Sequence, residues 1–395
     1  MMEWDDAPPA APAPRKKAPE EREFALRTAL ELMVRRRASD LHLKVGRPPV
    51  LRIDGVLSET ELPTLRPDDL KRIAEQVLSP LQREAVAEKK ELDFAIGVQG
   101  LGRFRITIFQ QRGTLGFAFR AIPVEVPGLK ELQLPSVLQQ IALSPRGLVL
   151  VTGITGSGKS TTLAALIRHL NEVRPVNIVT IEDPIEFLQR DVRAFISQRE
   201  VGIDTPSFHA ALRNVLRQDP DVVLLGEIRD LETMETALKA ANTGHLVLST
   251  LHTVDAAQTI GRIISFFEPH QHDEVRGLLA GALRAVVSQR LIPRADGAGR
   301  VAAAEVMINT AAIAERIRTG SDLHTVPELI AEGRTQYGMQ TFDQSLMDLY
   351  SRGLISLEAA MHHATSPSEF ALRASGIEAM GETTWAARDL GVQEG

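Results

Sequence analysis

One short stretch constrains the fold of this chain more than any other: residues 153–160 read GITGSGKS. This sequence matches the phosphate-binding loop pattern G-x-x-x-x-G-K-S/T at every fixed position. The apolar run 148–152 precedes the loop, and the helical pattern 160–170 follows it. A strand, a glycine-rich turn and a helix in this order predict an α/β unit with a phosphate site where the strand ends.

The loop residues predict how a nucleotide is held. Its glycines allow backbone N–H groups to surround phosphate oxygens, and the positive end of the following helix points at them. Lys159 can reach the β- and γ-phosphates, and Ser160 offers a hydroxyl oxygen to Mg²⁺. A chance glycine turn is the alternative, and the flanking strand and helix argue against it. We therefore predict ATP and Mg²⁺ as ligands, with these residues contacting the nucleotide: Gly153, Thr155, Gly156, Ser157, Gly158, Lys159, Ser160 and Thr161.

The pattern around the loop extends this unit to a whole domain. Short apolar strands alternate with helical patterns, which predicts a parallel sheet covered on both faces. The strands are expected at 148–152, 178–181, 222–225 and 246–250, and the helices at 160–170, 208–217 and 231–241. Further helices are expected from 255 to about 290 and then at 311–318, 326–332, 342–351 and 357–364, as a C-terminal helical subdomain.

The first part of the chain has a different pattern. A helix from about residue 21 ends at the arginines 35–37, and residues 67–77 form a second helical pattern. Five short apolar segments predict strands at 40–45, 50–53, 94–96, 102–109 and 116–122. We therefore predict a small α+β domain at 21–123, a proline-rich linker at 124–135 and the ATP-binding α/β domain at 136–375. Residues 1–20, rich in Ala and Pro, and residues 376–395 are predicted as tails, the first one disordered.

Carboxylates at strand ends decide whether the bound nucleotide is also hydrolysed. The strand 178–181 runs into Glu182, Asp183 and Glu186, at the sheet edge where ligands of α/β proteins bind. The strand 222–225 ends before Glu227, at a position where phosphate-loop enzymes more often place an aspartate that holds Mg²⁺. A lone acid there would as readily be a helix start or a surface charge. Together with the loop, these acids predict hydrolysis, with Ser160 and Glu227 holding Mg²⁺ partly through water.

Histidines and arginines supply further candidates. His252 follows the strand 246–250 and can contact the γ-phosphate or the attacking water, whereas a structural role is equally compatible with His245 at the start of that strand. Arginines also cluster in the small domain. They form either a solvated charged face or, in an oligomer, a group that reaches a neighbour's nucleotide: Arg103, Arg105, Arg112 and Arg120.

Composition excludes several classes of protein. A net charge of -6 disfavours nucleic acid as the main partner. With no cysteine among 395 residues, disulfides and thiolate zinc sites are excluded. No apolar run is long enough to span a bilayer and the N-terminal residues do not form a signal peptide, so we expect a cytoplasmic protein.

Four segments in order resemble the secretion-ATPase superfamily, and most closely its type IV pilus retraction ATPases: GITGSGKST at 153–161, TIEDPIEF at 180–187, LRQDPDVVLLGEIRD at 216–230 and TGHLVLSTLHT at 243–253. ASDLHL at 38–43 and GMQTFDQSL at 338–346 extend the resemblance to about 21–374. It implies a homohexameric ring in which a PAS-like N-terminal domain precedes a RecA-like ATPase domain.

The resemblance also implies roles for single residues. Glu186 matches the catalytic glutamate, Glu227 the Walker B acid and His252 the histidine box that senses the γ-phosphate. Arg105 and Arg120 match arginines that approach the nucleotide from the N-terminal domain, and Arg112 matches a less widely shared position. The secondary candidates around these motifs are Glu182, Asp183, His245 and Arg229.

In this family, hydrolysis drives pilin disassembly at the pilus base, on the inner membrane. The implied partners are a PilC-like platform protein and a paralogous retraction ATPase. Extension and secretion ATPases usually carry a four-cysteine zinc module and an extra N-terminal domain, so the lack of cysteine and the short segment before residue 21 favour retraction.

Alternatives stay open. The retraction-associated element AIRNLIRE is present only as AIAERIR at 312–318, which leaves an accessory retraction ATPase as an alternative. A pilus-extension or secretion ATPase and a DNA-translocating ring are further readings, the latter disfavoured by the acidic charge. A nucleotide-binding scaffold without turnover is the alternative from another class.

Overall fold

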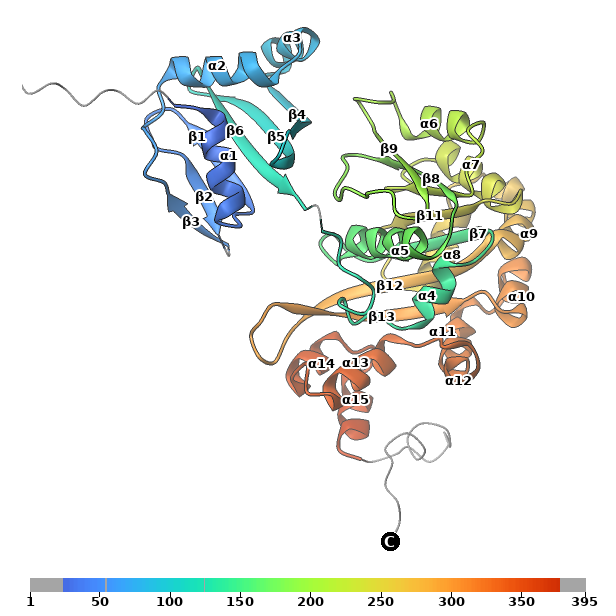
Figure 1. Ribbon diagram of the computed structural model, residues 1–395. Helices are drawn as coiled ribbons and strands as arrows, with labels where there is room; N and C mark the ends of the chain where they lie inside the picture. Colours follow the sequence, from blue (N-terminus) through green and yellow to red (C-terminus); the bar gives the residue numbers. More distant parts are fainter. Residues whose placement is uncertain (1–23, 54, 124, 377–395) are drawn as a thin grey trace, which may run out of the picture. The chain divides into compact units, whose positions relative to one another are not determined.

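The computed structural model describes residues 24–376, except residues 54 and 124 (Figure 1). It divides into two compact units, one ending at Ile122 and the other beginning at Pro123, and each is described by itself. The predicted tails lie outside the described residues, apart from residue 376. Within the described residues, no helix has the length and apolar character needed to span a membrane.

The first unit is an antiparallel sheet of six strands with three helices. The strand order is β3-β2-β1-β6-β5-β4. The strands are β1 (Asp40–Lys44), β2 (Val50–Ile53), β3 (Val56–Glu59), β4 (Glu91–Val98), β5 (Gly102–Gln111) and β6 (Thr114–Ile122). The helices are α1 (Leu26–Arg35), α2 (Pro67–Val77) and α3 (Pro80–Lys89). The sequence analysis did not predict β3 and α3.

Strand β5 explains how this sheet is built. Phe104, Ile106 and Ile108 are buried on one face of it, so the residues between them point to the other face. Arg112 and Gly113 both have positive φ, at 46° and 77°, as a two-residue hairpin turn of the primed type requires. The hairpin fixes the register of β5 on β6.

The second unit is built on a sheet of seven strands, in the order β13-β12-β7-β11-β10-β8-β9. Six strands are parallel, and β13 pairs antiparallel with β12 at one edge. The strands are β7 (Gly147–Thr152), β8 (Asn177–Glu182), β9 (Phe195–Glu200), β10 (Val222–Leu225), β11 (Leu246–Leu251), β12 (Leu283–Pro293) and β13 (Arg300–Ile308). The predicted α/β fold with a parallel sheet is confirmed.

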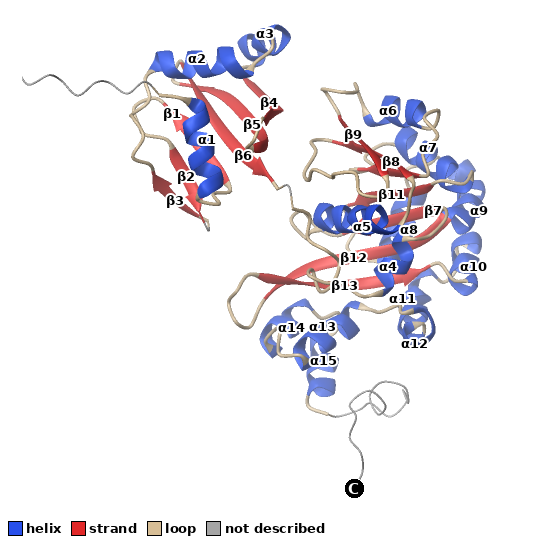
Figure 2. Cartoon of the chain, viewed as in Figure 1, coloured by secondary structure: helices blue, strands red, loops and turns tan. Residues whose placement is uncertain are grey.

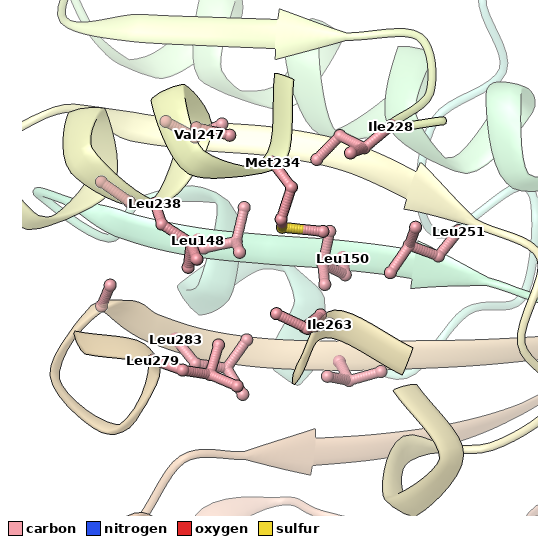
Figure 3. Packing of buried hydrophobic residues seen from close by; sticks show 14 of the residues in the cluster. Leu148, Leu150, Ile228, Met234, Leu238, Val247, Leu251, Ile263, Leu279 and Leu283 are labelled. Atoms are coloured by element: carbon pink, nitrogen blue, oxygen red, sulfur yellow. The ribbon is translucent and has the colours of Figure 1, made fainter. Parts of the chain in front are cut away.

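Helices cover both faces of this sheet (Figure 2). Leu148 and Leu150 of β7 pack into one core, and Val149 and Val151 pack into the other. The first core also contains residues of α6 (Phe208–Val215), α7 (Leu231–Asn242), α8 (Ala256–Ile264), α9 (His272–Ala282), α10 (Ala311–Thr319) and α11 (Val326–Glu332). In Figure 3, Met234 of α7 reaches Leu150 in this core. The second core contains α4 (Val137–Ala142) and α5 (Lys159–Val173).

The C-terminal helices pack on the end of the β12–β13 hairpin. Their core joins Ile292, Val301 and Ala303 to apolar side chains of the last three helices. The helices after α11 are α12 (Arg334–Tyr337), α13 (Phe342–Ser351), α14 (Leu357–His363) and α15 (Pro367–Ala374).

The structure corrects one part of the predicted layout. Helices were expected from 255 to about 290, but residues 283–290 belong to strand β12. A strand buried on both faces shows a continuous apolar run, which periodicity alone does not separate from a buried helix. The edge strands β9 and β13 were not predicted either, because four of the six residues of β9 are polar and β13 is rich in alanine, a helix-favouring residue.

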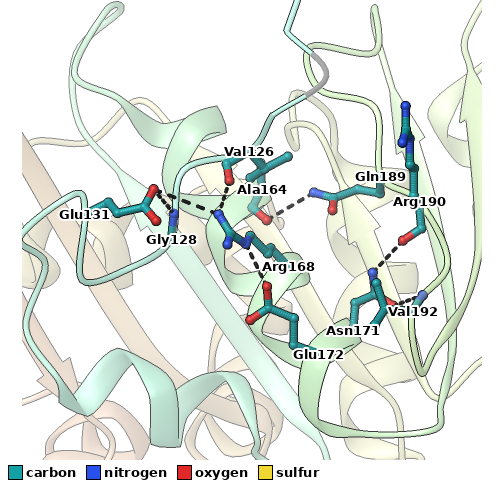
Figure 4. A network of polar contacts seen from close by, with 10 residues as sticks. All are labelled: Val126, Gly128, Glu131, Ala164, Arg168, Asn171, Glu172, Gln189, Arg190 and Val192. Atoms are coloured by element: carbon teal, nitrogen blue, oxygen red, sulfur yellow. Dashed lines mark hydrogen bonds and ion pairs between the residues drawn. The ribbon is translucent and has the colours of Figure 1, made fainter.

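Most of the predicted linker packs on the second unit. Val126, Leu129 and Leu134 are buried there. Figure 4 shows that the guanidinium of Arg168, on α5, donates to the carbonyl oxygen of Val126 and lies 3.9 Å from the carboxylate of Glu131. The segment 126–134 is therefore fixed to the helix that follows the phosphate-binding loop.

Candidate nucleotide site

The phosphate-binding loop joins β7 to α5 in a conformation that its glycines allow. Gly153, Gly156 and Gly158 have φ values of 141°, 79° and 92°, a region that residues with a Cβ atom rarely occupy. At Gly153 a Cβ atom would lie 2.5 Å from Ser157 Oγ and 2.6 Å from the carbonyl oxygen of Gln289 on β12. The backbone of strand β12 thus packs directly against the phosphate-binding loop at Gly153.

Lys159 is buried inside its own loop. Its Nζ donates to the carbonyl oxygens of Gly153, at 2.9 Å, and Ile154, at 3.0 Å. Burial lowers the pKa of Lys159, while the charges of Glu227 and Glu186 act in the opposite direction. Because phosphate oxygens are stronger acceptors than carbonyl groups, a bound nucleotide can draw this ammonium group away from the loop.

A cavity of about 430 Å³ opens at the loop, on the carboxyl edge of the sheet. It brings together the three predicted hydrolytic residues, Glu186, Glu227 and His252, although they follow different strands. The same cavity is lined by these candidate residues of the loop and of the β8 end: Thr155, Gly156, Gly158, Lys159, Ser160, Thr161, Glu182 and Asp183. Apolar side chains line another part of it, including Leu163, Ile167, Phe187 and Leu291.

Glu227 is held by two neighbouring side chains. Arg229 forms an ion pair with its carboxylate, and His252 Nε2 lies 3.3 Å from its Oε2. Burial would raise the pKa of Glu227, but the hydrogen bonds from Arg229 and His252 outweigh burial and leave the pKa below its ordinary value. The carboxylate is therefore ionised and directed into the cavity, as a ligand for a cation or an ordered water must be.

Glu182 has a different environment. Burial raises its pKa, although Thr180 and Gln198 donate hydrogen bonds to Oε1 at 2.7 and 3.1 Å. Its Oε2 accepts the N–H of Glu186 at 3.5 Å. Glu182 therefore supports the loop after β8, whereas the exposed side chain of Glu186 is free to meet a substrate.

The loop that carries Glu186 is tied to α5, the helix that begins at Lys159. In Figure 4, Gln189 Nε2 donates to the carbonyl oxygen of Ala164 at 3.1 Å. Asn171 Nδ2 donates to the carbonyl oxygen of Arg190 at 2.7 Å, and Asn171 Oδ1 accepts the N–H of Val192 at 3.0 Å. One helix thus fixes both Lys159 and the loop of the candidate catalytic glutamate.

The donors fit Mg²⁺. Ser160 supplies a hydroxyl and Glu227 a carboxylate to the same cavity. Magnesium in phosphate sites commonly takes one or two protein oxygens and completes its shell with phosphates and water. In residues 24–376 without 54 and 124, no group of three histidine or acidic side chains is arranged to hold a metal without such help.

The remaining candidates belong to other elements. His245 is at the opposite end of β11, roughly 20 Å along a six-residue strand, and its Nδ1 contacts the carbonyl oxygen of Ala240 at 3.1 Å. The candidate arginines belong to the first unit. Arg105 and Arg120 are direct partners across the β5–β6 ladder, and Arg120 donates to Asp40 at 2.8 Å. Arg112 lies in the hairpin turn.

Sequence reasoning missed several residues around the loop. Gln289 Nε2 donates to Thr162 Oγ1 at 2.9 Å, and Leu291 lies under Gly158. Arg300, the first residue of β13, also lines the cavity. All three belong to the β12–β13 hairpin, whose residues were predicted as helix or not assigned. These residues were missed because the two strands were not predicted.

Comparisons with known proteins show the family of this chain. Residues 118–384 match the family described as type II/IV secretion system protein. The chain is 44% identical to the type IV pilus ATPase PilU of Pseudomonas aeruginosa over 344 residues, covering 87% of this chain and 89% of that protein. It is 45% identical to the type IV pilus retraction ATPase PilT of the same bacterium over 333 residues, covering 84% and 96%.

A solved structure extends the similarity to the fold. The crystal structure of the pilus retraction motor PilT with bound ADP matches with a TM-score of 0.82 and 44% identity. The match covers 88% of this chain and 99% of that one.

Proposed function

Because the chain belongs to the type II/IV secretion system protein family and is an ATPase, we propose that its ATP hydrolysis powers the retraction of type IV pili. The observation that carries this proposal is the cavity in which Lys159, Glu186, Glu227 and His252 meet. The names of the two relatives, a pilus ATPase and a pilus retraction ATPase, indicate the machine in which the energy is used.

We propose the following roles in the reaction. Lys159 leaves the loop carbonyls and binds the β- and γ-phosphates. Ser160 and Glu227 would hold Mg²⁺, which would offset negative charge on the phosphate oxygens. Glu186 orients the attacking water and accepts its proton, while His252 contacts the γ-phosphate and, through Glu227, responds to its loss.

Glu186→Gln tests the catalytic role. The variant keeps the size of the side chain but cannot accept a proton, so ATP turnover should fall by about a hundredfold or more, whereas affinity for ADP stays unchanged. Glu235→Gln, which removes an exposed charge on α7, is the matched control and should keep full turnover. Near-normal hydrolysis by Glu186→Gln would remove Glu186 from the mechanism.

We further propose a homohexamer in which Arg105 and Arg120 act on a neighbour's nucleotide. Their cross-strand pairing supports this, because it puts two guanidinium groups on one face of the sheet. Mixing inactive Lys159→Ala and Arg105→Ala subunits tests it. Turnover should return in the mixture if each site takes its arginine from another subunit, and it should stay absent if Arg105 serves its own subunit.

The cellular role is proposed as retraction at the inner membrane, on a PilC-like platform protein. PilT and PilU relatives have nearly equal identity to this chain, so a genetic experiment separates the primary from the accessory role. Deleting the gene should leave surface pili that extend but do not retract if the motor is primary. A defect seen only under load or beside a second motor would indicate an accessory, and bald cells would contradict retraction.

A further inference from the structure

Strand β12, which was not predicted from the sequence, pairs with β7 directly before the phosphate-binding loop. Its Gln289 contacts α5 on one face, and its Ser288 points to the other face, beside the last residue of β7. That residue, Thr152, directly precedes the phosphate-binding loop. Thr152 Oγ1 donates to Ser288 Oγ at 3.0 Å, and both side chains are fully buried.

A buried carboxyl group, that of Glu305, lies next to Ser288; we call Thr152, Ser288 and Glu305 the row. Ser288 pairs with Thr152 on one side and with Glu305 of β13 on the other, so the three residues lie side by side across three strands. Glu305 is only 5% exposed. Ser288 is the direct cross-strand partner of Glu305, and its hydroxyl counteracts part of the rise in the pKa of that carboxyl group. Because Ser288 Oγ accepts from Thr152, the Ser288 proton is left to point toward Glu305.

Glu305 has a second contact that leads back to the site. Its Oε1 accepts the N–H of Ala256, the first residue of α8, at 2.8 Å. The four residues before Ala256 connect β11 to α8 and begin with His252; we call residues 252–255 the His252 loop. A carboxylate at the start of a helix is also favoured by the helix dipole.

We propose that Glu305 is a positioning residue for ATP hydrolysis, which fixes the His252 loop relative to the phosphate-binding loop through Ala256 on one side and Ser288 and Thr152 on the other. This inference rests on the proposed contact of His252 with the γ-phosphate. Glu305 itself touches neither nucleotide nor metal in this arrangement. It acts by holding the N-terminal end of α8.

The chemistry explains why a carboxylate is needed. The N–H of Ala256 donates to it, and the neighbouring hydroxyl of Ser288, whose oxygen already accepts from Thr152, has its own proton left to donate. A glutamine has a single acceptor oxygen. If this oxygen accepts the N–H of Ala256, the NH₂ group faces Ser288, and the proton of the Ser288 hydroxyl has lost its acceptor. Glu305→Gln therefore keeps the volume but disrupts one of the two arms.

The test compares Glu305→Gln with His252→Ala, the double variant and a control, using the full chain. We expect Glu305→Gln to lower kcat about tenfold while ADP affinity changes by less than about twofold, since the effect concerns the γ-phosphate end of the site. In the His252→Ala background the same change should have almost no further effect. Ser345→Ala is the control, because it removes a buried hydrogen bond to the N–H of Ala304 on the same strand without contacting the row.

Hydrogen exchange of the segment 252–260 supplies a readout that does not depend on turnover. Exchange at Ala256 should become faster in Glu305→Ala, which removes the acceptor of this N–H, and remain unchanged in Ser345→Ala. If Glu305→Gln lowers kcat equally with and without His252, the inference is wrong while the proposed function stands. If neither the wild type nor any variant hydrolyses ATP, the proposed function fails. Unchanged exchange at Ala256 overturns the inference by itself.

Discussion

The buried carboxyl group of Glu305 should make the stability of the protein depend on pH. Burial raises the pKa of this group from an ordinary value of 4.5 to about 7, and the negative charge of Asp255 adds to the effect. The hydrogen bond from Ala256 and the positive charge of Arg290 oppose it without cancelling it. Replacing Glu305 with glutamine removes the titration and leaves the shape.

The sign and size follow from linkage. Because the pKa is higher in the folded chain than in the unfolded one, the folded chain binds more protons between pH 4.5 and about 7. The free energy of unfolding therefore falls as the pH rises through this window. With about 1.4 kcal/mol for each pKa unit, the complete loss is about 3 kcal/mol, of which about 2 to 3 kcal/mol lies between pH 5 and pH 8.5.

Urea unfolding followed by circular dichroism at pH 5 and pH 8.5 measures the effect. Other titrating groups act alike in both proteins, so the difference between wild type and Glu305→Gln isolates this carboxyl group. We expect the wild type to lose about 2 to 3 kcal/mol relative to the variant on going to pH 8.5. A difference that is the same at both pH values would refute the reasoning.

Further predictions concern the site and the core. Lys159→Ala should abolish detectable ATP and ADP binding in equilibrium dialysis, since the buried ammonium group is lost. Arg229→Ala removes a hydrogen bond that lowers the pKa of Glu227, so the acid limb of the ATPase pH profile should move to higher pH. If the limb does not move, the titration of Glu227 does not determine it. Met234→Ala should destabilise the protein by about 2 to 4 kcal/mol in urea titrations and leave ADP affinity unchanged. Gly153→Ala should lower both stability and nucleotide affinity, and calorimetry showing normal ADP binding would contradict the close contact under the loop.

The second unit was predictable where local pattern and chemistry agree. The phosphate-binding loop has fixed residue types, and strand β10 has the predicted bounds because four apolar residues stand between turn-forming neighbours. In the first unit, the same holds for α2, which starts at Pro67 and shows a clear helical period. Glu186, Glu227 and His252 could be named together because parallel strands end at the same edge of a sheet.

The rest depends on pairing between distant segments. Strand β12 contains Val286, Val287 and a buried polar pair, and only its neighbours β7 and β13 reveal why the polar residues are there. Glu305 looks like any acid in an alanine-rich segment until Ser288 and Ala256 are placed beside it. The candidate arginines are a similar case, since their proposed role requires a second copy of the chain and their sequence shows only arginines alternating with apolar residues.

The contact between Gly153 and the carbonyl oxygen of Gln289 has a consequence for how fast a nucleotide can bind. Because the main chain of another strand packs against the phosphate-binding loop, the loop is already ordered before a nucleotide binds. Binding therefore causes little further loss of conformational entropy in the loop. Capture of ATP then requires the lysine to change acceptors and little else. Nucleotide association should therefore be quick, and the slow events of the cycle should come after it.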